Sequence, residues 1–289
     1  LGILCIGAAV VLLFAEQPAL FLTSSSAALL LTGHISGCVY YNTAMYFAGS
    51  RYTGRLIGMG MGAAILLQFV VQNLMPQSVA FIISIVFSVA FVMCFIIKAP
   101  KDWILENPLP YSADTKKEFK KALLLIVAVV LMSLVAGMID SVLTAFNAEK
   151  SYDIYGGVRL LADIKERKYL PLSTVCTILL SSVCMFFLSD EVSYFAGTAL
   201  MYLYSGFYVI FFTVMFLDFA PKSSRPELWA GMGRIVRSFT VAATVLPAFN
   251  IYGAVGNTVL AVVSCLLSIL ILLVLLPYLS NAAVSLKPI

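Results

Sequence analysis

Two ionisable side chains lie near the middle of long apolar stretches of this chain. His34 is its only histidine, and Asp140 is the only acidic residue between residues 122 and 146. An ionisable group at such a position normally faces a water-filled cavity or a charged partner, because desolvation of its charge is costly. Histidine titrates near neutral pH, so His34 is a candidate proton relay. The alternative is a neutral His34 that is hydrogen-bonded within the protein.

Small, polar and aromatic residues share helical faces with these two groups. At steps of three and four residues, Ser133 and Gly137 fall on the face of Asp140, and Tyr41 falls on the face of His34. A carboxylate with several aromatic rings suits a cationic or amphipathic organic molecule. The alternative is packing, since small residues let helices approach closely and aromatic stripes often pack against neighbours. The predicted substrate-binding residues are His34, Tyr41, Ser133, Gly137, Asp140, Tyr204 and Tyr208.

The elements that position these residues are apolar runs of membrane-spanning length. A helix needs about 20 apolar residues to cross the hydrocarbon core of a bilayer. The runs cover residues 1–15, 21–48, 56–75, 78–97, 122–146, 170–188, 193–217, 229–249 and 254–279. With 62% hydrophobic residues and a mean hydropathy of +1.01, a soluble globular protein is excluded. The sequence predicts an all-α, polytopic transmembrane helical bundle in a lipid bilayer, and we expect the plasma membrane.

The basic residues are distributed unevenly between the connections. If every second connection is cytoplasmic, that side holds every lysine and arginine except Lys150. Cytoplasmic loops of membrane proteins carry such an excess of basic residues. We therefore predict that residues 99–121, 163–168 and 220–228 face the cytoplasm. The net charge of +4 then reflects topology, and no nucleic-acid partner is expected.

Two stretches of the chain resemble each other. Each has a Ser-Gly pair, an aromatic-rich helix, a short basic turn and a Gly-Met-Gly helix start. The first copy begins at Ser36-Gly37 and reaches Gly-Met-Gly at 58–60. The second begins at Ser205-Gly206 and reaches Gly-Met-Gly at 231–233. Both copies have the same predicted orientation, and parallel repeats of this kind form the two halves of one class of transporter.

With this repeat, the chain resembles the major facilitator superfamily of transporters. Residues 99–121 resemble the charged central loop of that family. Asp163, Arg167 and Lys168 match its loop motif G-x-x-x-D-[RK]-x-G-[RK]-[RK], whereas Arg159, Ile164 and Glu166 depart from it. The resemblance implies two pseudo-symmetric halves: residues 1–98 (helices three to six), the central loop 99–121, and residues 122–289 (helices seven to twelve). Helices one and two would precede Leu1.

The same resemblance assigns roles to parts of the chain. In the family, helices one, four, seven and ten line the central cavity, which here implies residues 21–48, 122–146 and 193–217. The loop with Asp163, Arg167 and Lys168 would form charge pairs that hold one end of the cavity closed. The alternative for these three residues is topological anchoring by their charge.

Residues 147–162 do not fit the expected helix eight. They contain several charges and Gly156-Gly157, and sixteen residues of helix rise only about 24 Å. Either the segment crosses the membrane as a short, broken helix shielded by neighbours, or the chain lacks most of helix eight. We favour the second interpretation, a partial version of the family.

These features predict a secondary active transporter, a permease or efflux protein, for a small organic solute. It would use a proton or ion gradient and alternating access. The alternative is a non-transporting membrane sensor of the same architecture. The Gly-rich stretch 54–62 lacks the Lys-Ser/Thr of a phosphate-binding loop. One histidine and no metal-binding cysteine spacing argue against an enzyme, a metal site or a cofactor. We expect a monomer, and the solute, the coupling ion and the direction of transport stay open.

Overall fold

The computed structural model describes residues 2–13, 17–48, 52–76, 115–150 and 169–284, with part of 79–93. All regular elements in these residues are helices, which confirms the all-α prediction. The longer helices are α1 (Gly2–Leu13), α2 (Pro18–Tyr46), α3 (Thr53–Leu74), α5 (Thr115–Lys150), α6 (Tyr169–Cys184), α7 (Glu191–Phe219), α9 (Met232–Val255) and α10 (Asn257–Val284). The short ones are η1 (Met185–Phe187), η2 (Ala220–Lys222) and α8 (Pro226–Trp229).

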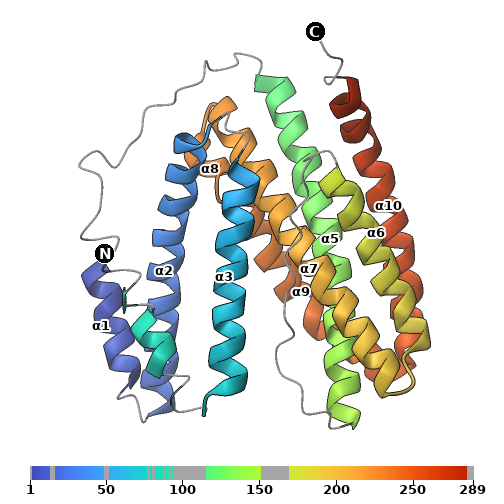
Figure 1. The fold of residues 1–289 in the computed structure, drawn as a ribbon, viewed down its shortest axis with the longest axis horizontal. Coiled ribbons are helices and arrows are strands. Elements are labelled where there is room, and N and C mark those ends of the chain that lie inside the picture. The colour runs from blue at the N-terminus through green and yellow to red at the C-terminus, as the bar shows by residue number, and fades with distance from the viewer. Residues whose placement is uncertain are drawn as a thin grey trace.

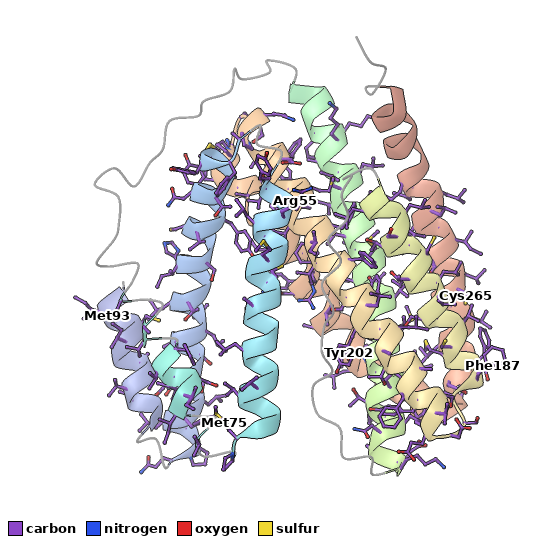
Figure 2. All side chains as sticks on the ribbon, in the orientation of Figure 1. Arg55, Met75, Met93, Phe187, Tyr202 and Cys265 are labelled. Carbon is purple, nitrogen blue, oxygen red and sulfur yellow. The ribbon has the colours of Figure 1, made fainter. Side chains whose placement is uncertain are left out.

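The chain is a multi-pass membrane protein. In the described residues, 6 helices are long and apolar enough to cross a bilayer: α2 and the helical segments that contain α5, α6, α7, α9 and α10. Large apolar side chains are exposed on them, including Leu30, Phe187 and Phe239. Phe187 points away from the bundle in Figure 2. A hydrocarbon environment covers such a surface, whereas water would not.

Most helix bounds follow the apolar runs, but α5 is longer than its run. It begins at Thr115, before the predicted start at 122, and continues to Lys150. The last residues of the predicted central loop are therefore helical. Lysines are good helix formers, so the run at Lys116, Lys117, Lys120 and Lys121 extends the helix beyond its apolar part. The structure describes only part of the predicted run 78–97, and the described residues of this run are helical.

The helices form two groups, α1–α3 and α5–α10 (Figure 1). In the second group α5 is central and packs against α7, α9, α10 and α6. Its buried residues include Val129, Met132, Ile139 and Val142. Helix α7 begins with a capping box, in which the Asp190 carboxylate accepts a hydrogen bond from the Ser193 backbone N–H at 2.8 Å. Helix α9 contains Pro247 within its span.

Hydrogen bonds between described residues show which helix ends of the second group lie together. Tyr252 of α9 donates a hydrogen bond to Glu149 at 3.3 Å, and Asn257 of α10 donates one to the Met185 carbonyl at 2.6 Å. The C-terminal ends of α5 and α6 therefore lie together, and their N-terminal ends both lie at the opposite end (Figure 1). The turn with η2 and α8 lies at that same opposite end.

This end carries most of the described basic residues, and we call it the basic end. It holds the exposed residues Arg55, Lys120, Lys121, Lys222 and Arg225. Figure 2 shows Arg55 near one end of α3 and Met75 at the other end of the same helix. The other end, which we call the acidic end, holds Glu149, Lys150, Asp190 and Glu191. The charge rule for membrane proteins predicts that the basic end faces the cytoplasm.

Cysteine labelling checks this orientation. In a variant without its six native cysteines, a single cysteine at Lys222 should react with a membrane-impermeant maleimide only after the cells are permeabilised. A single cysteine at Glu191 should react in intact cells, because it lies at the acidic end. The opposite pattern would place the basic end outside.

Candidate functional site

The predicted aromatic residues of α7 are fully buried and hydrogen-bonded to α5. The Tyr204 hydroxyl donates to the Met132 carbonyl at 2.9 Å, and the Tyr208 hydroxyl donates to the Val129 carbonyl at 3.3 Å. Tyr208 also shares a short hydrogen bond with the Ser133 hydroxyl. The two tyrosine rings are stacked, with centroids 5.4 Å apart. The structure thus brings three of the predicted residues, Ser133, Tyr204 and Tyr208, into contact, and their hydrogen bonds link α7 to α5. Their role as substrate contacts stays a prediction.

Gly137 is a packing position. A Cβ atom on Gly137 would lie 3.0 Å from Cβ of Thr244 in α9, closer than ordinary van der Waals contact. One turn further, the Ser141 hydroxyl bonds to the Gly137 carbonyl at 2.6 Å and to the Val245 carbonyl at 3.1 Å. Small residues permit such close approach between membrane helices. The packing alternative therefore describes the immediate surroundings of Gly137.

Asp140 belongs to a different strip of α5. Between Met132 and Phe146, Asp140 and Thr144 are the exposed residues in an otherwise largely buried helix. Met138 faces the other way, towards Ser264 of α10, and its sulfur lies 3.8 Å from that hydroxyl. Ser141 faces α9, and Leu143 packs against Gly197 of α7. Helix periodicity then directs Asp140 away from α10, between the sides that face α7 and α9.

The residues predicted on α2 lie at two different levels. His34 is exposed on α2. Two turns later, Tyr41 is half-buried and packs against the contact between the two helix groups. In the structure, Tyr41 therefore takes part in the contact with the second helix group, α5–α10, whereas the His34 side chain does not. A proton-relay role for His34 stays a prediction.

Two further predictions lie outside the described residues. The gating residues Asp163, Arg167 and Lys168 are among them. Of the doubtful segment 147–162, only residues 147–150 are described, and they form the last turn of α5.

The two helix groups meet near the basic end. There, Ala44 of α2 packs with Leu217, Ala220 and Ala230, and the rings of Tyr40, Tyr41 and Trp229 surround them. The Arg234 guanidinium of α9 donates a short hydrogen bond to the Tyr40 hydroxyl and lies over the Tyr40 ring at 5.9 Å. We call this set of contacts the basic-end contact.

A second part of the basic-end contact joins α3 to α7. Gly58 lies 3.7 Å, measured from a Cβ position, from Cδ1 of Ile210. Gly58 belongs to the first copy of the sequence repeat and Ile210 to the second. The two similar stretches are thus neighbours, and their superposition as equivalent halves stays a prediction.

Sequence analysis missed Arg237. It counted this residue only among the bases of the cytoplasmic side. In the structure Arg237 lies in α9, between Gly233, which packs on α7, and Thr244, which packs on Gly137 of α5. Its Nε atom is buried without a hydrogen-bond partner in the structure. The signal was present in the sequence, because Gly233, Arg237, Thr240 and Thr244 recur at helical spacing on one face of α9.

Comparison of the chain with protein-family models, with curated proteins and with solved structures finds no match.

Proposed function

We propose that this chain is a secondary active transporter of a small organic solute, which works by alternating access. An architecture like that of the major facilitator superfamily, with two pseudo-symmetric halves, is part of the proposal, as is a place in the plasma membrane. The observation that carries it is the basic-end contact: described contacts between α2 or α3 and the C-terminal helices involve residues near that end. A two-group bundle joined near one end corresponds to one extreme of alternating access.

The basic-end contact is suited to repeated opening. Its centre consists of alanines, which bury little apolar surface, and burial stabilises by only about 0.8 kcal/mol per methylene. A hydrogen bond to a charged group, such as Arg234 to Tyr40, contributes about 1.5–3 kcal/mol. Moving one elementary charge through 100 mV releases about 2.3 kcal/mol. Gradient energy and contact energy are therefore of the same order.

Asp140 supplies a candidate coupling group. It is exposed on the strip of α5 between the α7 and α9 sides, in the half of α5 nearer the acidic end. A carboxylate there can be reached from that end while the basic-end contact is closed. It can bind a proton or a cation before the bundle changes conformation. An ionisable group within a membrane span is a functional candidate, because its charge is costly to place in the membrane.

A reversible crosslink tests the transport cycle. Ala44 and Ala220 are members of the same buried cluster across the two groups. A variant with cysteines at both positions, on a cysteine-free background, should form a disulfide that holds the basic-end contact closed. We expect accumulation of labelled organic solutes in proteoliposomes with an imposed proton gradient to stop after oxidation and to return after reduction.

Single-cysteine variants at Ala44 and at Ala220 are the matched controls, and oxidation should leave their transport unchanged. Full accumulation by the crosslinked protein would contradict alternating access through this contact. Solute binding without accumulation by the unmodified protein would favour the alternative, a membrane sensor.

A further inference from the structure

We propose that Arg237 binds an anionic group, a carboxylate or a phosphate, of the transported solute. This inference rests on the proposed transport function and names the class of solute. It starts from the position of Arg237 on the buried stripe of α9. Gly233, Thr244 and Ala248 on this stripe are buried, and Arg237 follows Gly233 by one turn.

Contacts of α9 on either side of Arg237 define the position of this residue along the bundle. One turn towards the basic end, Gly233 packs so tightly on α7 that an added Cβ would lie 2.7 Å from the Phe216 ring and 3.0 Å from the Phe212 ring. Two turns towards the acidic end, Thr244 packs on Gly137 of α5. Arg237 therefore lies one turn beyond the point where α7 and α9 touch, on the side towards the acidic end.

The environment of Arg237 requires a partner. It lies about 8 Å along α9 from Met232, within a segment long and apolar enough to span a bilayer. Its Nε is buried and unpaired, and a buried donor without a partner is costly. The nearby tyrosine hydroxyls direct their protons to α5 carbonyls. Arginine presents a planar fork of donors that matches carboxylate and phosphate oxygens.

The neighbouring arginine provides a contrast on the same helix. Arg234 is exposed at the basic end, and its guanidinium donates a hydrogen bond to Tyr40 in the basic-end contact. Arg237 is three residues further into the span and makes no such contact with α2 in the structure. Residues three apart in a helix have Cβ atoms about 5–6 Å from each other. This short distance along α9 separates Arg234, which contacts α2, from Arg237, the proposed anion-binding residue.

An alternative for Arg237 is structural: its long side chain could extend to the headgroups and cover apolar surface. In that case the guanidinium would lie in the interface, and its Nε would be solvated. The Nε atom is buried instead, on the stripe of α9 that packs on α7 at Gly233 and on α5 at Thr244. Arg237 as a whole is only partly buried, and the proposal assigns the remaining donors of its guanidinium to the solute.

Ligands of one shape and different charge test the proposal. The full chain is purified in lipid nanodiscs, and its thermal unfolding is followed with benzoate, phenyl phosphate, benzamide or benzamidinium. We expect stabilisation by benzoate or by phenyl phosphate, and the two arms distinguish a carboxylate from a phosphate. Arg237→Gln should weaken this anion affinity about 10- to 100-fold, the range for a hydrogen bond to a charged group. Arg237→Lys, which keeps the charge, should retain part of it.

Arg225→Gln is the matched control, because Arg225 is exposed at the basic end and should leave anion affinity unchanged. Absence of stabilisation by both anions, an equal response of the Arg237→Gln protein, or preferential stabilisation by benzamidinium would each overturn the proposal. Anion binding without accumulation would refute transport but not this site. Gradient-driven accumulation of neutral or cationic solutes, with no stabilisation by anions, would support transport and refute the anion site at Arg237.

Discussion

Gly233→Ala should destabilise the protein, although alanine is the better helix former. The new Cβ would lie 2.7 Å from a Phe216 ring carbon and 3.2 Å from the Phe212 backbone oxygen, and both phenylalanines are buried. Helix α9 must therefore move away from α7. Overpacking of this kind typically costs about 1–3 kcal/mol. Thermal unfolding in nanodiscs, without added solute, is the measurement.

Gly231→Ala is the matched control for this substitution. It lies two residues earlier, and no atom lies within 4 Å of its Cβ position. We expect the control to unfold at or near the wild-type temperature. If both alanine variants unfold alike, the close contact between α7 and α9 does not exist in the membrane.

Asp140→Asn should have the largest effect on transport. The substitution removes the charge with little change of volume, and Asp140 is one of two exposed residues between Met132 and Phe146 of α5. If Asp140 carries the coupling proton, proteoliposomes with a proton gradient should no longer concentrate the solute inside. Exchange of labelled for unlabelled solute, which needs no net proton movement, should continue.

Thr144→Val is the control, because Thr144 is the neighbouring exposed residue of the same strip. We expect gradient-driven accumulation to persist in this variant. Undiminished accumulation by the Asp140→Asn protein would remove Asp140 from the mechanism. Loss of both accumulation and exchange would assign it to solute binding instead of coupling.

The fold was predictable where one physical effect dominates. A span needs a long apolar run, and the runs at 21–48, 193–217 and 254–279 each lie almost entirely within one observed helix. The start of α5 was predicted too late, because hydropathy marks the edge of the bilayer and not the end of a helix. Lysines at 116–121 continue the helix, since their backbone groups pair within it whether or not lipid surrounds them.

The site was predictable only in part, for a related reason. The sequence placed Ser133 on one helical face with Gly137 and Asp140, and only the structure shows its hydrogen bond with Tyr208 of α7. Spacing along one helix does not show which neighbour covers that face, so the sequence left packing and substrate contact both open for Tyr204 and Tyr208, whose rings the structure buries. Arg237 was missed because a count of basic residues per connection treats each arginine as a marker of topology. The position of Arg237 within the span is recognised only from its place on α9 between Gly233 and Thr244, which both pack on neighbouring helices.

Pro247 divides α9 into two mechanical segments. A proline has no N–H to donate and its ring clashes with the carbonyl four residues earlier, here that of Ala243, so helix stiffness falls at this turn. Before the proline, α9 is held by the packing of Gly233 and Thr244. Beyond it, the Tyr252–Glu149 hydrogen bond links the helix to α5 near its end. Ala248, directly after the proline, is buried in the core of the second group. Both segments of α9 are therefore packed, and any bending of this helix during a conformational change would concentrate at the turn before Pro247.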